Sequence, residues 1–532
     1  MENDSLIQLI KGMSLGEKIH FKRSLHIKKI IAEKQPAYLK LFNAIDKASD
    51  TDKASIHKKL IATEFNANYN ETKRYLFEVL IDFLEKRGEE NNVQQQLSIL
   101  INKAELLGSR NCIEECNYFL QKAKSIAIMH ELHLHLIRIL VIEKTFLIRS
   151  NTNSNIIEAY DTIYKQIKEE RKKYESYMQY QEYCDKIGIL MSVDTSTRDE
   201  QIANNLQVLY AHFSSLNVYD TVKIKILKEK FLYSYNYLLA NYEVAYTHLL
   251  CIEELFQKTP PFMKSEKILY HTNLRQQFIL TFQLKKYHAS FTIFQKILPL
   301  LDEMSNFDKD RYVMMTHVSR MIIHLKKGEI EKLNDSIREA VEKFELKDNE
   351  ILNKGSVNHL ILYYFLSHIC MFSGHIKLAR HFCNLVDAMK KTKNTVREDV
   401  FYSARLLSLL IVYEQKDIFY FENRIKINQQ IFRRHDKIYE LEEIVFSHLR
   451  KLLKIWGDKE EEIAIWKMML ARIEEKFSAA FLENILKFDL ILWIKSKIED
   501  RPVIHLLKEQ AQKEHPEIFE LNMDGLNTVK NL

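Results

Sequence analysis

Glycine and proline are scarce in this chain, whose 532 residues include 10 Gly and 6 Pro. Sheet proteins need many tight turns, and tight turns draw on these two residues. Their scarcity excludes most sheet-rich architectures and predicts an all-α protein of long helices joined by short connections. Because the chain exceeds the usual limit for one compact core, about 250–300 residues, it needs either several domains or a repeat array.

The chain also lacks a strong charge bias, a long apolar run and a cysteine framework. Its net charge of +6 is small for this length, whereas nucleic-acid binders carry a stronger or more local basic bias. The longest apolar run, residues 360–372, is interrupted by Ser367 and His368, and it is too short to span a bilayer. The acidic N-terminal sequence is not that of a secretory signal, so we expect reduced thiols and a cytoplasmic location.

A turn pattern recurs along most of the chain. Its clearest copy is Ser-Gly-His-Ile-Lys-Leu-Ala at residues 373–379, with an apolar residue two positions after the glycine and a small residue five positions after it. Similar turns centre on residues 240, 285, 328, 374, 416 and 457, at steps of 41 to 46 residues. Extending the period predicts further turns near residues 108, 150, 195 and 499. Each repeat is then a pair of helices of about 20 and 16 residues joined by a tight turn.

These hairpins must stack, because one hairpin cannot bury both of its faces. The Gly-x-apolar-x-x-Ala turn resembles that of the tetratricopeptide-like helical-repeat superfamily over residues 93–515. The chain departs from that family in its period of about 43 rather than 34 residues, and it lacks the Trp-Leu-Gly-Tyr signature and the closing proline. The resemblance implies an α-solenoid of stacked helical hairpins over residues 91–532, and no binding residue is carried over.

Residues 1–90 do not follow the period. We expect them to form a separate N-terminal helical domain or a cap on the array, joined to it by the polar residues 88–92. The expected helices cover residues 14–33, 36–48, 53–65 and 70–87.

The last two of these helices have the outline of a helix–turn–helix, with Lys73 and Arg74 opening the second helix. In DNA readers the first turn of the recognition helix meets base edges. Residues 18–40 also carry seven bases against one acid. DNA binding by this unit is therefore an alternative, although plain helical bundles share the same geometry.

Four tyrosines at three-residue steps, Tyr174, Tyr177, Tyr180 and Tyr183, form one stripe on a predicted helix. Such a stripe could line a concave peptide groove, because tyrosine supplies contact area at a low entropy cost. It could equally be a packing face between hairpins, with the hydroxyls reaching its rim.

Catalytic signatures are missing from the sequence: we find no glycine-rich phosphate loop, no Gly-x-Ser-x-Gly elbow and no His-Glu-x-x-His motif. Cys112, Cys116, His130 and His133 could in principle bind zinc, which takes four such ligands. Cys116, however, stands at a position where a small core residue belongs. We therefore expect no catalytic residue, no metal and no cofactor.

Taken together, these features predict a non-enzymatic intracellular scaffold or adaptor that binds a protein or peptide partner through a helical-repeat surface. The alternative is a transcriptional regulator with an N-terminal helix–turn–helix-like DNA-binding unit and a solenoid sensor domain. Nucleic acid is the disfavoured partner, and a membrane is not expected.

Overall fold

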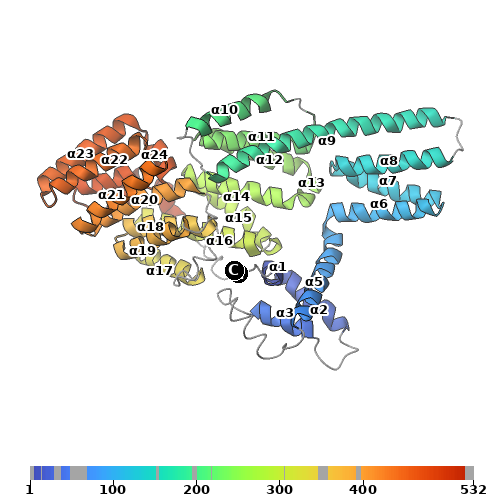
Figure 1. Cartoon of the computed structure of the whole chain (residues 1–532), viewed down its shortest axis with the longest axis horizontal. Helices are drawn as coiled ribbons and strands as arrows, with labels where there is room; N and C mark the ends of the chain where they lie inside the picture. Colours follow the sequence, from blue (N-terminus) through green and yellow to red (C-terminus); the bar gives the residue numbers. More distant parts are fainter. Residues whose placement is uncertain are drawn as a thin grey trace.

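The computed structural model describes residues 5–13, 15–28, 37–47, 69–150, 155–193, 200–216, 219–304, 306–344, 357–390 and 397–521. Helices account for 88% of these residues and none of them lies in a strand, which confirms the all-α prediction. Figure 1 shows an N-terminal unit at the bottom, an arm projecting to the right and a larger body on the left.

The N-terminal unit has a hydrophobic core of its own. Phe21 and Phe42 meet in this core with ring centroids 4.8 Å apart, and Ile10 and Leu80 pack around them. Three expected helices are confirmed as α2, α3 and α5, α1 was not predicted, and the expected helix at 53–65 lies outside the described residues. The bounds are α1 (Ser5–Gly12), α2 (Leu15–Lys28), α3 (Ala37–Lys47) and α5 (Tyr69–Asn91).

The predicted linker at residues 88–92 was wrong. Helix α5 continues to Asn91, and α6 (Val93–Ser109) begins after a single residue. That residue, Asn92, caps α6, because its side-chain oxygen accepts a hydrogen bond from the Gln94 amide at 2.9 Å. The glutamates of this polar stretch are good helix formers, so polarity alone does not mark a linker.

The arm consists of α6 to α10 and contains the first repeats of the array. It departs from the repeat pattern at one helix. A helix of 38 residues, α9, stands where a hairpin connection was expected; its first half packs on α8 and its second half on α11. Residues 156–193 contain no proline and one glycine, and the Arg171–Glu175 ion pair at 2.8 Å supports the middle of the helix. One rigid rod of about 57 Å therefore joins the arm to the body. The bounds are α7 (Ile113–Met129), α8 (His133–Ser150), α9 (Ile156–Val193) and α10 (Glu200–Ser214).

The body continues the array of hairpins from α11 to α26. Helices α16, α18 and α20 pack side by side, and α17, α19 and α21 are their hairpin partners. All of residues 400–413 in α20 are buried, and a helix buried all round lies in the interior. The bounds are α11 (Val222–Leu238), α12 (Tyr242–Lys258), α13 (Pro260–Ser265), α14 (Lys267–Gln283), α15 (Tyr287–Ile297), η2 (Leu298–Glu303), α16 (Asn306–Lys327), α17 (Ile330–Lys343), α18 (Val357–Phe372), α19 (Ile376–Lys390), α20 (Glu398–Glu414), α21 (Ile418–Arg434), α22 (Glu440–Lys454), α23 (Lys459–Lys476), α24 (Ala479–Leu486), α25 (Leu490–Ile498), α26 (Val503–Glu514) and η4 (Pro516–Glu520).

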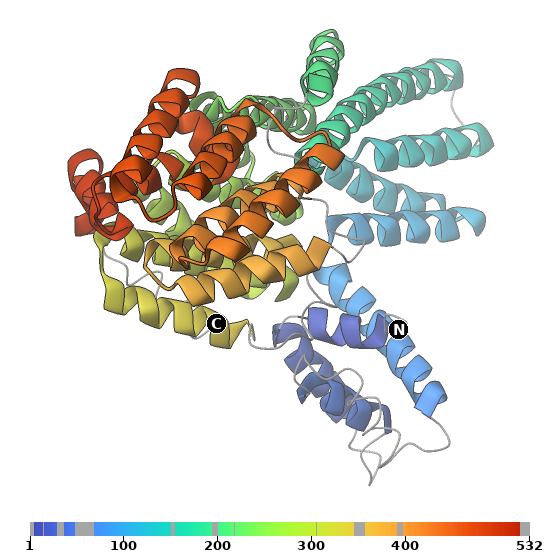
Figure 2. The same cartoon turned by 60° about the vertical axis from the view of Figure 1, so that its left-hand side comes forward.

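The body closes on itself. Helix α26, which confirms the final helix expected near residues 502–514, packs on α16, and η4 packs on α15 and α16. Ala511 and Ile518 share a core cluster with Tyr312 and Ile323 of α16. The last hairpin of the array thus covers an earlier one, whereas the arm stands apart from the body in Figure 2.

The predicted repeat turns are confirmed at the level of backbone dihedrals. Each of the six positions is left-handed, with φ between 59° and 96°. In four of these turns the next amide donates to a carbonyl five residues back, as His375 does to Cys370 at 2.8 Å. This bond defines the Schellman ending of a helix. Asp500, with φ of 51°, marks the turn expected near residue 499, and Asn111, with φ of 64°, the one expected near 108. The turns expected near 150 and 195 border residues outside the described ranges.

The small residue five positions after the turn is fully buried at Ala245, Ser290 and Ala379. A small side chain there lets the two helices of a hairpin approach closely. The apolar residue two positions after the turn is less regular, since Tyr287 is buried and Ile330 is exposed.

Replacing the left-handed alanine at one turn by glycine should stabilise the protein. Ala240 has φ of 59°, a conformation that strains any residue with a Cβ. We expect Ala240→Gly to raise the free energy of unfolding by about 0.5–1 kcal/mol, after allowing for the greater freedom of glycine in the unfolded chain. Urea denaturation followed by circular dichroism measures the change.

Two control substitutions separate backbone strain from other effects. Ala211→Gly, on an exposed position of α10, should cost about 1 kcal/mol, because the helix interior disfavours glycine. Gly374→Ala, at φ of 86° with open space around the added Cβ, should also destabilise. Destabilisation by Ala240→Gly would contradict the account of these turns.

Candidate partner-binding surfaces

The predicted tyrosine stripe lies on the second half of α9, where that helix meets α10 and α11. Tyr180 is 1% exposed and packs edge-on against Phe213, with ring centroids 5.4 Å apart. Tyr183 contacts the same ring at 6.2 Å. Burial raises the pKa of Tyr180. Tyr180 therefore belongs to the packing between helices.

The other end of the stripe is more accessible. Tyr174 and Tyr177 are half-buried and stack with their centroids 6.4 Å apart. Burial, with the nearby carboxylate of Glu266, raises the pKa of Tyr177. Tyr174 and Tyr177 therefore remain partly accessible to a binding partner. The four tyrosines together do not form one open groove, because Tyr180 is buried.

Lys73 and Arg74 are the fifth and sixth residues of α5, so they lie in its second turn and do not open the helix as the helix–turn–helix interpretation expects. The Arg74 guanidinium pairs with Glu78 at 3.1 Å on an exposed face. The preceding helix of the proposed motif, at residues 53–65, lies outside the described residues. The packing that would define a helix–turn–helix is therefore not among the contacts of α5.

The four residues considered for zinc are not brought together. Cys116 is in the first turn of α7 and His130 follows its last turn, so about 21 Å of helix separates them. His130 Nδ1 lies 3.0 Å from the Ser265 hydroxyl, and His133 Nδ1 donates to Glu170 at 2.6 Å. Across the described part of the chain, no three His, Cys, Asp or Glu side chains form a cluster that could hold a metal ion.

The turn between α7 and α8 anchors the arm to the body. Both carboxylate oxygens of Glu131 accept backbone hydrogen bonds from the first turn of α11, from Val222 and Lys223, each at 2.8 Å. A carboxylate at a helix N-terminus is favoured by the helix dipole. Burial raises the pKa of Glu170, but hydrogen bonds from His133 and Lys173 outweigh it and hold that pKa below its ordinary value. This polar junction fixes the direction in which the arm projects.

An exposed apolar row on α8 is the surface that sequence reasoning missed. Leu134, Val141 and Ile148 are 55%, 40% and 54% exposed. Because seven residues make two helical turns, the three side chains share one face of the helix. The signal was present in the sequence, since α8 carries more apolar residues than one buried face can use.

Helix α6 borders this row. Arg138 of α8, which lies between the first two members of the row, pairs with Glu105 of α6 at 3.0 Å. The residue after Glu105, Leu106, is itself half exposed. The α6–α8 surface therefore offers apolar side chains beside an ion pair, and apolar surface rimmed by polar groups marks interaction sites.

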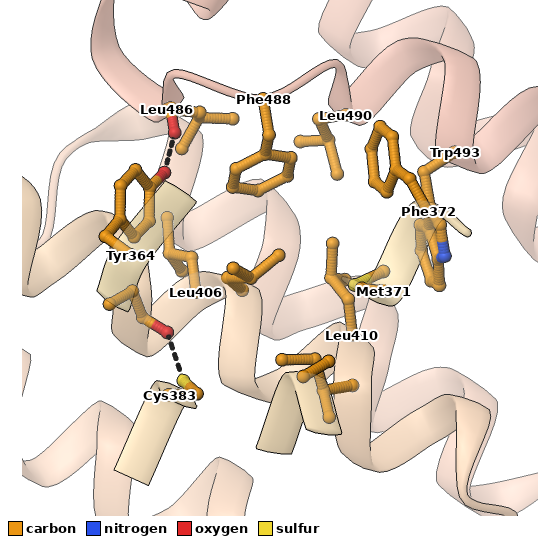
Figure 3. Packing of buried hydrophobic residues seen from close by; sticks show 14 of the residues in the cluster. Tyr364, Met371, Phe372, Cys383, Leu406, Leu410, Leu486, Phe488, Leu490 and Trp493 are labelled. Atoms are coloured by element: carbon orange, nitrogen blue, oxygen red, sulfur yellow. Dashed lines mark hydrogen bonds between the residues drawn. The ribbon is translucent and has the colours of Figure 1, made fainter. Parts of the chain in front are cut away.

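One side of α18 and α20, which carries Tyr364 and Ser403 and which we name the inner face of the body, is covered by a later segment of the chain. The Tyr364 hydroxyl of α18 donates to the backbone carbonyl of Leu486, and the Ser403 hydroxyl of α20 donates to that of Ile485 at 2.7 Å. Figure 3 shows the side chains of Leu486, Phe488 and Leu490, at the turn between α24 and α25, pointing toward α18 and α20. This face is covered in the structure, unlike that of the arm.

Three buried thiols and one buried imidazole have pKa values shifted away from those of reactive groups. Burial raises the pKa of the Cys184, Cys370 and Cys383 thiols to about 12. Burial, with the charge of Lys326, lowers the pKa of His368 to about 3. Catalytic groups have pKa values matched to a proton transfer near neutrality, so these shifts describe core residues.

Comparison of the chain with models of protein families, with curated proteins and with solved structures finds no match. The resemblance to the tetratricopeptide-like superfamily stays a prediction. None of the described helices combines the length and the apolar content needed to cross a bilayer.

Proposed function

We propose that this protein is a non-enzymatic scaffold or adaptor of the cytoplasm that binds a protein or peptide partner through the open face of its arm. The observation that carries the proposal is the α8 row, Leu134, Val141 and Ile148, exposed at heptad spacing. A partner helix with apolar residues at the same spacing would bury this row. Helix α8 already packs on α7 and α9, yet it keeps three further apolar side chains at its surface. A partner helix that buries these side chains would explain why they are apolar.

Three features of the rest of the chain support this assignment. The inner face of the body is covered by residues near Leu486, which leaves the arm as the open repeat surface. The six cysteines form no disulfide, and unpaired thiols are typical of a reducing compartment. The burial-shifted thiols and histidine support a non-enzymatic role, because groups of this kind serve packing.

Affinity capture from the native cytoplasm tests the proposal. Tagged wild-type protein should retain a partner that the Leu134→Glu, Val141→Glu double variant loses, since a charge in the centre of an interface removes a hot spot worth about 2 kcal/mol or more, roughly 30-fold in affinity. Phe419→Glu is the matched control, because Phe419 is 84% exposed on α21 of the body. Both variants change exposed side chains and should melt like the wild type. Retention of every partner by the double variant would reject the arm as the binding surface.

A further inference from the structure

The first helix of the last repeat is broken. Where other repeats have one helix, residues 478–498 form α24, a short turn and α25. Lys487 ends α24 in the left-handed conformation, with φ of 54°. Asp489 starts α25, because its carboxylate accepts from the Leu492 amide at 2.8 Å. Residues 478–489, which we name the plug, leave the line of the repeat and enter the inner face of the body.

The body holds the plug by its backbone as well as by its side chains. Tyr364 and Ser403, from two different helices, donate their hydroxyl hydrogens to consecutive carbonyls, those of Leu486 and Ile485. Figure 3 shows the first of these bonds, with Tyr364 reaching up to the turn that carries Phe488. Contacts to carbonyl oxygens do not depend on which side chains the bound segment carries. Because Ile485 and Leu486 are the last two residues of α24, the two hydroxyls cap the C-terminal carbonyls of a helix, and a groove that receives a helix is one way in which peptides are recognised.

Apolar side chains of the plug fill the floor of the groove. Leu486 and Phe488 are buried, and Phe488 meets Phe372 of α18 edge-on at a centroid distance of 6.4 Å. Beside Ile485 and Leu486 a crevice stays open. It is lined by Asp399, Tyr402, Ser403, Leu406, Phe432, Lys437, Tyr439 and Glu442 of α20, α21, α22 and the turn before α22. This crevice has a volume of about 30 Å³, roughly the space of one water molecule, so the plug fills nearly all of the groove.

Charges on the groove and the plug are complementary. Lys285, at the turn before α15, pairs with Glu483 of the plug at 3.3 Å. Lys326 of α16 also faces Glu483 and Asp489; burial lowers the pKa of Lys326, while these carboxylates raise it. Two bases beside the groove, on the turn before α15 and on α16, thus face two acids of the plug, an arrangement that favours one sign of ligand over the other.

We propose that the inner face of α18 and α20 is a second binding site, a peptide groove that the plug occupies as an intramolecular ligand. A partner segment of the same chemistry, with apolar side chains separated by carboxylates, competes with the plug for this groove. This site is separate from the binding surface of the arm. The apparent affinity of the groove for such a segment rises with the fraction of molecules whose plug has left the groove.

Binding of a labelled peptide with the sequence of residues 478–489 tests this site on the full chain. We expect the double variant Leu486→Ser, Phe488→Ser, whose own plug is weakened, to bind the peptide on the order of 10–100-fold more tightly than wild type, because the competent fraction rises. Adding Tyr364→Phe and Ser403→Ala to that variant should remove the gain, and a peptide with serine at the positions of Leu486 and Phe488 should bind neither protein. If a plug-weakened variant with wild-type circular dichroism binds the peptide no better than wild type, the groove is not a binding site.

Hydrogen exchange on the wild-type protein gives a second test that needs no substitution. The amides of residues 482–487 should exchange faster than those of α18 and α20, because an intramolecular ligand leaves its site without unfolding the site. Exchange of the plug amides at the rate of α18 and α20 would mean that the plug leaves only when the body unfolds. That result would overturn the proposal whatever the variants do.

Discussion

Trp493→Ala should be among the most damaging single substitutions in this chain, with a loss of about 3–5 kcal/mol in the free energy of unfolding. Trp493 is fully buried in α25, where its ring meets Trp466 edge-on at a centroid distance of 5.2 Å. Its indole N–H donates to Glu414 of α20 at 2.8 Å. Truncation would open a cavity at the point where the last repeat joins the interior of the body.

Tryptophan fluorescence gives a local readout of this loss. The three tryptophans of the chain lie at residues 456, 466 and 493, so the two that remain report on the C-terminal repeats. In the variant their urea transition should move well below the wild-type midpoint. Phe419→Ala truncates an aromatic ring that is mostly exposed. This control should change the free energy of unfolding by no more than about 0.5 kcal/mol. Equal shifts in the two variants would show that the ring of Trp493 is not part of a stabilising core.

Asp387→Asn should cost about 3 kcal/mol, because it leaves two guanidinium groups inside the protein without an anion. Asp387 of α19 pairs with Arg405 of α20 at 3.2 Å and with Arg424 of α21 at 2.7 Å. All three side chains are more than four-fifths buried. Removal of one partner of a buried pair is expensive since the remaining charge stays desolvated. Urea denaturation followed by circular dichroism at neutral pH measures this loss.

A surface ion pair of the same residue types provides the control. Asp335 and Arg338 of α17 pair at 3.4 Å, but both side chains are mostly exposed. Asp335→Asn should therefore change stability by less than about 1 kcal/mol. A similar effect of the two substitutions would mean that water reaches the Asp387 cluster.

The repeat turns were predictable because they are local. The positions of Ala240, Lys285 and Gly374 followed from a short residue pattern that recurs at a regular spacing, and all three are left-handed in the structure. A Schellman ending is specified by the residues of one helix terminus and needs no distant partner. Only some of these turns use glycine, so the low glycine content did not hide the period.

Features that depend on distant contacts were not predictable in this way. The continuous helix α9 arises because its two halves find different partners, α8 and α11. The break at Lys487 places Leu486 and Phe488 against α20 and α18, which lie two and three repeats earlier in the chain. Neither choice is encoded in the local pattern, which is compatible with an ordinary hairpin in both places.

The binding surfaces show the same limit. The tyrosine stripe was visible as a spacing, yet the burial of Tyr180 against Phe213 depends on where α10 lies. The row of Leu134, Val141 and Ile148 looks like a core face until α7 and α9 are seen to cover other sides of α8. Spacing identifies a face, and only packing shows whether a neighbour already covers it.

The contact of α26 with α16 sets an order of events during synthesis. Hairpins of a repeat array can fold as they leave the ribosome, because each contacts mainly its neighbours. The cluster that holds Tyr312 and Ile323 of α16, however, is completed by Ala511 and Ile518, which are made much later. A nascent chain that stops before α26 therefore presents an apolar strip on α16, a surface of the kind that chaperones hold. Release from such a chaperone would coincide with the synthesis of α26 and η4, which cover that strip.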